Sequence, residues 1–114
     1  MQDLNRLEIE ILHVIARDYP MVKSHIPYLQ IKNREYTGVG MYANFSYQNF
    51  TDKEVPPLED GILSVNQIVT LDGLENGLGF TLDISKGLIN FIELFTYDDE
   101  TWDGSFDVFA FEDI

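Results

Sequence analysis

The spacing of apolar residues near the start of the chain predicts one amphipathic helix. Apolar side chains recur there every three or four positions, as they do along one face of a helix: Leu4, Leu7, Ile11 and Ile15, widened by Leu12 and Val14. Asp3 offers an N-cap and Pro20 blocks continuation, so the predicted helix covers residues 3–18. Residues 21–31 allow two interpretations, a short helix opened by Pro27 or a coil that docks on the core.

Beyond this point the apolar pattern changes to a period of two, which is typical of strands. Residues 46–61 are the exception, because they lose the period and contain Pro56 and Pro57, and a long surface loop is predicted there. A short hairpin connection is expected at residues 85–87, with Gly87 in a positive-φ conformation. The strand candidates are residues 30–36, 39–47, 65–71, 79–84, 88–97 and 106–112.

This order of elements predicts the fold class. Strands that follow one another without intervening helices favour antiparallel pairing, and the one helix can cover one face of the sheet. A chain of 114 residues with 45% hydrophobic residues suits one domain with its own core. We therefore predict a single α+β domain over residues 1–114, with the N-terminal helix packed on a mostly antiparallel, largely meandering sheet of five or six strands.

The charge is strongly negative and unevenly distributed. The net charge is −13; residues 1–36 contain five basic and five acidic side chains, and the rest of the chain has two lysines against fifteen carboxylates. Nucleic acids and anionic membranes both require basic patches, so we expect neither as a partner. A basic protein remains a suitable partner, because complementary charge accelerates encounter. Acidity that merely keeps a small protein soluble is the open alternative.

The sequence also predicts the compartment. The first twenty residues have three acidic side chains within the apolar pattern, unlike a secretory signal, and no apolar run is long enough to span a membrane. The chain has no cysteine and hence no disulfide. A cytoplasmic protein is the expectation, and the oligomeric state is left open.

Metal and cofactor motifs are incomplete. A calcium loop with Gly104 at position six would place Thr101 at position three and Ala110 at position twelve, where an oxygen ligand and a bidentate glutamate are needed. The Gly-x-Gly pairs at residues 38–40 and 77–79 lack the third glycine of a dinucleotide fingerprint. With two histidines and no cysteine, nucleophilic hydrolysis also has few candidate residues. We expect no metal and no cofactor.

One carboxylate has a claim to unusual chemistry. In residues 88–97, alternation places Glu93 on one face with Ile89, Phe91, Phe95 and Tyr97. A glutamate between aromatic side chains is desolvated unless it is paired, which describes a catalytic acid and a structural carboxylate equally well. Arg34 is a possible partner for Glu93, and Glu35 a possible second acid, so the pair Glu93 and Glu35 is the weak catalytic candidate.

The strings "REYTGVGMYANF" and "GLGFTLDISKGLINFIELFTYDDETW", which begin at Arg34 and end at Trp102, resemble a family of small bacterial proteins. In that family a Thr-Gly-Val-Gly segment precedes a Gly-Phe strand and a Leu/Ile-Glu-x-Phe/Tyr-Thr-Tyr strand. The family has no assigned reaction, so the resemblance implies site residues without a chemistry. The matching residues are Arg34, Glu35, Gly38, Gly40, Gly79, Phe80, Gly87, Glu93 and Tyr97. Turns explain the glycines, which leaves weight on the two glutamates, the arginine and the tyrosine.

Two functions follow as hypotheses. The first is a non-enzymatic interaction module whose acidic surface binds a basic protein partner, with a toxin-neutralising immunity protein as its sharpest form. Its contact residues would be Asp98, Asp99, Glu100, Trp102 and Asp103. The second is a small-molecule-binding or hydrolytic domain centred on Glu93, with Glu35, Arg34 and Tyr97 around it. The aromatic side chains of Trp102 and Tyr97 could floor a ligand pocket or an interface, although in so small a domain core packing is the more common role of such residues.

Overall fold

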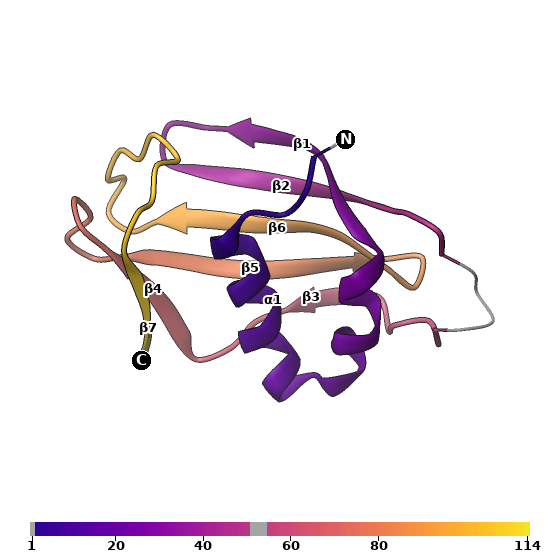
Figure 1. Cartoon of the computed structure of the whole chain (residues 1–114). Coiled ribbons are helices and arrows are strands. Elements are labelled where there is room, and N and C mark those ends of the chain that lie inside the picture. The colour runs from indigo at the N-terminus through magenta and orange to yellow at the C-terminus, as the bar shows by residue number, and fades with distance from the viewer. Residues whose placement is uncertain (1, 51–54) are drawn as a thin grey trace.

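The computed structural model describes residues 2–50 and 55–114 and shows an α+β fold, as predicted. The N-terminal helix lies across a mostly antiparallel sheet (Figure 1). Within these described residues the sheet has seven strands, one more than the upper prediction. The elements are α1 (Arg6–Asp18), the 3₁₀-helix η1 (Pro20–Tyr28), β1 (Leu29–Tyr36), β2 (Gly40–Tyr47), β3 (Gly61–Leu63), β4 (Gln67–Leu71), β5 (Leu78–Ser85), β6 (Leu88–Thr96) and β7 (Phe109–Asp113).

Helix α1 begins three residues later than the sequence predicted, because Asn5 and not Asp3 is the N-cap. The Asn5 side chain accepts from the backbone N–H of Glu8, and the Glu8 carboxylate accepts from the backbone N–H of Asn5, each at 2.8 Å. This reciprocal capping box satisfies two N–H groups that the first turn leaves without helical partners. Residues 21–31, for which two interpretations were open, belong to a 3₁₀-helix followed by β1. This helix begins at Pro20, so Pro27 lies inside it and does not open it as predicted.

The strand order is β1-β2-β6-β5-β4-β7, so the sheet is not a simple meander. Strand β2 pairs with β6, and β7 pairs with β4. The short β3 was not predicted; it begins at Gly61, the last residue of the predicted loop, and it pairs with residues of β5. Because β6 occupies the other edge of β5, β3 and β4 share one edge of that strand. The predicted hairpin at residues 85–87 is confirmed, with φ of 55° at Lys86 and 78° at Gly87.

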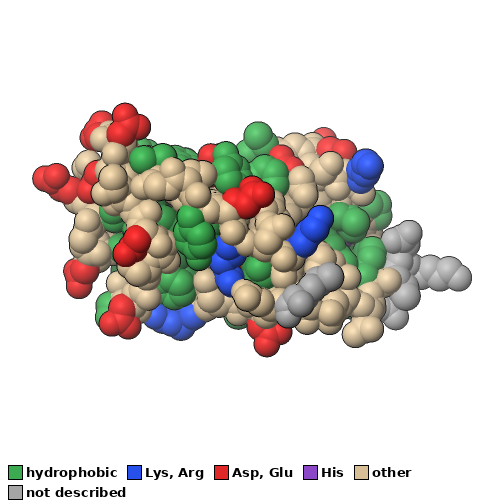
Figure 2. Space-filling view, turned by 90° about the horizontal axis from the view of Figure 1, so that it is seen from above, with side chains coloured by type: hydrophobic (Ala, Val, Ile, Leu, Met, Phe, Trp, Pro, Cys, Tyr) green, Lys and Arg blue, Asp and Glu red, His purple; other side chains and the backbone are tan. Residues whose placement is uncertain are grey.

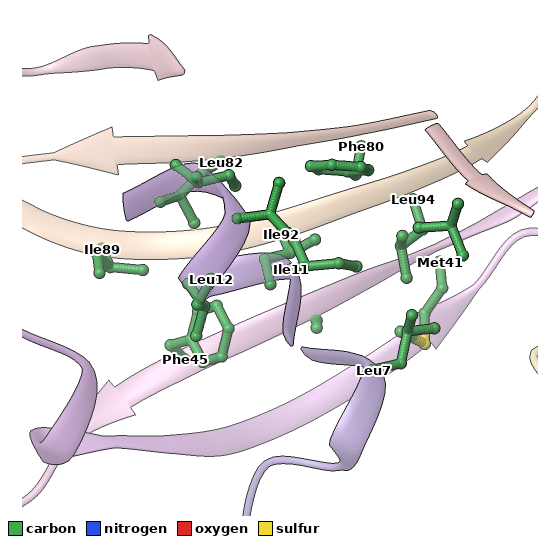
Figure 3. Packing of buried hydrophobic residues seen from close by; sticks show 14 of the residues in the cluster. Leu7, Ile11, Leu12, Met41, Phe45, Phe80, Leu82, Ile89, Ile92 and Leu94 are labelled. Atoms are coloured by element: carbon green, nitrogen blue, oxygen red, sulfur yellow. The ribbon is translucent and has the colours of Figure 1, made fainter. Parts of the chain in front are cut away.

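The core fills the space between the sheet and the helices. Leu7, Ile11 and Leu12 of α1 pack against the buried faces of β2, β5 and β6 (Figure 3). Among the residues that the structure describes, no helix lies over the opposite face of the sheet (Figure 1). Within the described residues, neither helix combines the length and the hydropathy needed to cross a lipid bilayer.

Two β-bulges decide which side chains reach which face. Lys32 is the extra residue in β1, because Ile31 is opposite Phe45 while Asn33 is opposite Asn44. Asn90 has the same role in β6. One extra residue moves the following side chains to the other face, so both bulges control the positions of the candidate site residues described next.

Candidate functional site

Three connections meet at one end of the sheet and form what we call the acidic end, comprising residues 37–39, 72–77 and 97–108. They converge there because the strands that they join alternate in direction. Figure 2 shows carboxylates (red) spread around this end of the molecule, at the left. The three connections contain no lysine or arginine, and their carboxylates are Asp72, Glu75, Asp98, Asp99, Glu100, Asp103 and Asp107.

Glu100 holds two of these connections together. Its carboxylate accepts from the backbone N–H groups of Glu75 and Asn76, both at 2.9 Å. These backbone hydrogen bonds hold the pKa of Glu100 below its usual value, since they favour the charged form. Asp103 similarly accepts from the backbone N–H and the hydroxyl of Ser105, which lowers its pKa. Both carboxylates are therefore charged at neutral pH, and each braces a loop.

Trp102 does not have the role of a surface anchor that the sequence suggested. Its side chain is only 7% exposed and belongs to the hydrophobic core. The indole Nε1–H donates to the Ser105 carbonyl at 2.9 Å, and the backbone N–H of Trp102 donates to the Gly38 carbonyl at 2.9 Å. The ring anchors the last connection to the body of the protein, and exposed carboxylates are left to make outside contacts.

An open cleft of about 570 Å³ lies between these connections. Residues from all three of them line it, including Gly38, Asp72, Leu74, Trp102 and Asp103. Asp98 and Asp99 are exposed on the same connection as Trp102, and both have positive φ, 55° and 57°. Such a backbone turns sharply, so it presents successive carboxylates outward.

Glu93 lies on the uncovered face of the sheet, half-buried, where it accepts a hydrogen bond from the Tyr42 hydroxyl at 3.3 Å. The pKa of Tyr42 is raised mainly by the negative charge of Glu93 and, to a smaller extent, by this hydrogen bond. Tyr42 is opposite Glu35 on one side and Glu93 on the other, so the structure brings both predicted acids into one row. The predicted face is wrong for Ile89 alone, because the bulge at Asn90 turns Ile89 into the core.

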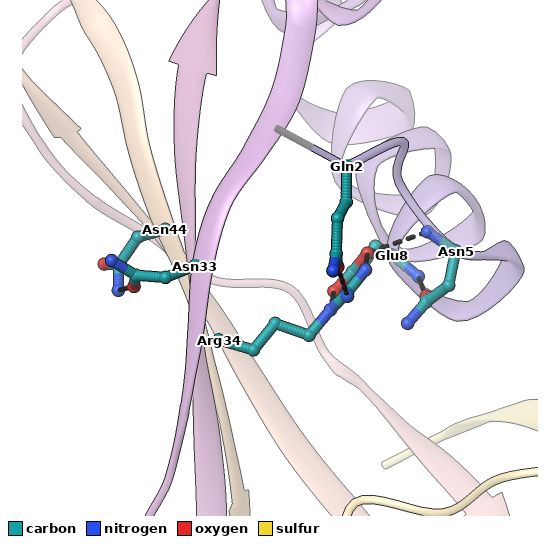
Figure 4. Close-up of polar contacts among 6 residues, drawn as sticks. All are labelled: Gln2, Asn5, Glu8, Asn33, Arg34 and Asn44. Atoms are coloured by element: carbon teal, nitrogen blue, oxygen red, sulfur yellow. Dashed lines mark hydrogen bonds and ion pairs between the residues drawn. The ribbon is translucent and has the colours of Figure 1, made fainter.

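Arg34 lies on the other face and does not pair with Glu93, contrary to the possibility raised from the sequence. The bulge at Lys32 directs Arg34 toward α1, where Nε and Nη2 donate to the two carboxylate oxygens of Glu8 at 2.8 and 2.9 Å (Figure 4). Arg34 Nη1 also donates to the Gln2 side chain at 2.8 Å. The hydrogen bond to Glu8 raises the pKa of Arg34 further above its already high value. The contacts of Arg34 with Glu8 and Gln2 are structural. They hold Arg34 away from the predicted site residue Glu93, which lies on the other face of the sheet.

Tyr97, the remaining predicted site residue, is partly exposed just beyond β6. Its ring makes an edge-to-face contact with Phe95, with centroids 5.7 Å apart. The side chains of Phe95 and Tyr97 both extend over Gly79, where a Cβ atom would meet the Phe95 ring at 2.3 Å and the Tyr97 hydroxyl at 2.7 Å. Gly79 is thus needed so that these rings can lie close to the sheet.

Sequence reasoning missed a buried polar chain that includes His25. The His25 side chain is fully buried, with Nε2 at 2.8 Å from the Pro56 carbonyl and Nδ1 at 2.9 Å from the Tyr47 hydroxyl. Because a carbonyl only accepts, Nε2 carries the proton and Nδ1 accepts from Tyr47. The Tyr47 oxygen accepts from the Ile89 backbone N–H at 2.7 Å, and burial raises the pKa of Tyr47 to about 12. Nothing in the spacing of the sequence signals this long-range chain.

Among residues 2–50 and 55–114, no three histidine, aspartate or glutamate side chains are grouped so that they would hold a metal ion. Comparisons with protein-family models, with curated proteins and with solved structures give no match for this chain.

Proposed function

We propose that this protein is a non-enzymatic interaction module that binds a basic protein through its acidic end. The observation that carries the proposal is the convergence of seven carboxylates on three connections that contain no lysine or arginine. A cleft of about 570 Å³ between the connections offers a concave surface for a basic side chain or loop.

The carboxylates of this end divide into two groups with different roles. The carboxylate oxygens of Glu100 and Asp103 accept hydrogen bonds from loop N–H groups, so these two residues fix the shape of the surface. Asp98 and Asp99 lie exposed beside them and are the contact residues of the proposal, with Asp72 on the cleft wall. A preorganised surface of one charge binds its partner with less ordering cost and accelerates encounter.

The sharper form of the proposal is a toxin-neutralising immunity protein. Nuclease toxins are often basic because their substrates are polyanions, and an acidic surface can cover such a groove. This form rests on charge and on analogy with such pairs.

The test uses charge reversal at the two exposed aspartates. Asp98→Lys/Asp99→Lys keeps the two Glu100 hydrogen bonds and removes the longer one, 3.3 Å, that Asp98 accepts from the Asn76 side chain. Asp3→Lys/Glu112→Lys is the control with the same change in net charge. We expect the wild type and the control to capture a basic protein from an extract of the source cells. The purified captured protein should bind the reversed variant at least about tenfold more weakly, and wild-type affinity should fall as NaCl rises.

Equal affinity of the reversed variant and the wild type would overturn the proposal.

The alternative function, a small-molecule-binding or hydrolytic domain centred on Glu93, is supported by the row of Glu35, Tyr42 and Glu93 on the uncovered face. If binding survives reversal at the acidic end but is lost in a normally folded Glu93→Gln variant, that alternative replaces the first proposal.

A further inference from the structure

The three-residue strand β3 leaves one sheet edge open at a distance from the acidic end. Gly61, Ile62 and Leu63 pair with Ile84, Asp83 and Leu82 of β5. Within the described part of the chain, β3 has no strand on its other side. An open edge presents unpaired backbone N–H and C=O groups, which another extended segment can use.

A groove of about 410 Å³ lies beside this edge, between β3 and the end of the helical region. Tyr19, Met21 and Leu58 contribute apolar surface to it. The Tyr19 hydroxyl donates to the Ser64 carbonyl at 3.3 Å, which holds the end of the helix next to the end of β3. The groove therefore lies between residues 18–22 of the helical region on one side and the edge of β3 on the other.

Apolar side chains at this edge are unusually exposed. Ile62 is 70% exposed and Met21 is 56% exposed. In β3, Leu63 points toward the core face together with its partner Leu82, while Ile62 points to the opposite face. An added strand whose residues alternate would therefore place its apolar side chains beside Ile62 on one face, and its basic side chains, with their aliphatic stems beside Met21, on the other face.

The charge of the groove selects among possible occupants. Asp18, Glu59 and Asp60 line it, and no lysine or arginine is among its lining residues. Asp60 is engaged with the backbone N–H groups of Lys86 and Gly87, whereas Asp18 and Glu59 are exposed. A second copy of the chain would bring the same carboxylates together on a protein of net charge −13, which disfavours self-pairing.

We infer that the β3 edge and its groove form a peptide-binding site for an extended segment in which apolar and basic residues alternate. The segment would add to the sheet antiparallel or parallel to β3, with backbone hydrogen bonds supplying affinity and the groove selecting apolar side chains. Basic residues of the segment would approach Asp18 and Glu59. The inference goes beyond the proposed function, because these residues belong to none of the three connections of the acidic end.

The test uses a defined probe, a fluorescein-labelled nonapeptide of alternating valine and lysine, measured by fluorescence anisotropy with the full chain. A second peptide of the same sequence carries N-methyl groups on its valines, so its charge is unchanged while its N–H donors are lost. A third peptide replaces each lysine by glutamate. The protein variants are Ile62→Thr and Met21→Gln, and the control is Ile114→Thr, which changes a side chain that is 72% exposed outside both proposed surfaces.

We expect the valine–lysine peptide to bind and to shift the backbone amide signals of residues 61–63 in a ¹⁵N–¹H spectrum. N-methylation, the Ile62→Thr change, the Met21→Gln change and the replacement of lysine by glutamate in the peptide should each weaken binding about tenfold or more, while Ile114→Thr leaves the affinity unchanged. Equal binding of the N-methylated peptide would overturn strand addition and indicate adsorption by charge alone. Absence of binding, or concentration-dependent dimerisation in sedimentation that Ile62→Thr removes, would overturn the inference in favour of an unused edge or a second copy.

The two proposals fail separately. Asp98→Lys/Asp99→Lys should leave peptide binding at β3 intact, even if it abolishes capture of the basic protein. Conversely, loss of peptide binding in Ile62→Thr should leave that capture unchanged, because the two surfaces share no residues.

Discussion

Glu8 has two structural duties at once. Its carboxylate closes the capping box of α1, and it also accepts two of the three hydrogen bonds that the Arg34 guanidinium donates. The Glu8 side chain is fully buried, whereas the Arg34 side chain is 17% exposed. A buried charge is tolerable only when it is paired and hydrogen-bonded, so Glu8 depends on Arg34 and Asn5 together.

We therefore expect Arg34→Met to lower the free energy of unfolding by about 3 kcal/mol, because it leaves the Glu8 charge buried without its cation. The double variant Glu8→Gln/Arg34→Met should recover a large part of this loss, since no unpaired charge remains. Urea denaturation followed by circular dichroism gives the free energy of unfolding of Arg34→Met, of Glu8→Gln and of the double variant. A double variant as unstable as the sum of its two single variants would show that the ion pair contributes no coupling energy.

The residue scale also shows where sequence reasoning fails. The Asn5-x-x-Glu8 spacing was available as a capping signal, but the apolar stripe already begins at Leu4, which favoured Asp3 as the predicted N-cap. The partner of Arg34 was not available, because the bulge at Lys32 decides which face receives its side chain. A bulge depends on the fit between two strands, which no local pattern records.

At the scale of elements, periodicity identified the helix and the longer strands, while β3 was missed because three residues are too few to show a period of two. The pairing of β2 with β6 was also missed, since the sequence favours neighbours along the chain. Strands β2 and β6 can pair closely because residue 40 is a glycine. A Cβ atom at this position would meet the Leu94 carbonyl oxygen of β6 at 2.2 Å.

We expect Gly40→Ala to destabilise the protein by about 3 kcal/mol, because the obstructing atom is backbone and cannot rotate away. Gly38→Ala is the matched comparison, since a Cβ atom there meets nothing within 4 Å although φ is +86°. Gly38→Ala should cost only about 1–2 kcal/mol, the strain of a left-handed alanine. Chemical denaturation of the two variants gives the difference, and equal losses would contradict the proposed close contact.

At the scale of the whole molecule, the charge excess was evident from composition but its location was not. The sequence placed most carboxylates after residue 36, and only the antiparallel arrangement brings three connections to one end. Like charges gathered at one end repel one another, and dissolved salt screens that repulsion.

The melting temperature should therefore rise by about 5 °C between about 0.01 and 0.5 M NaCl, as repulsion is screened. Asp98→Asn/Asp99→Asn should melt higher than the wild type at low salt and should respond less to added NaCl. Asp3→Asn/Glu112→Asn removes the same charge from other parts of the surface and should have the smaller effect. Calorimetric scans across the salt series provide the comparison; identical responses of both variants would disprove local repulsion.

The pairing of β2 with β6 also sets an order in time. Its partners lie far apart along the chain, from Asn44 with Phe91 to Gly40 with Phe95. A ribosome that adds about 5–20 residues per second needs several seconds to make the intervening segment. The β1–β2 hairpin forms within about 1–10 μs, so it waits with one edge open until β6 emerges. For this protein, the interval of synthesis is when an unpaired strand is most exposed to other nascent chains.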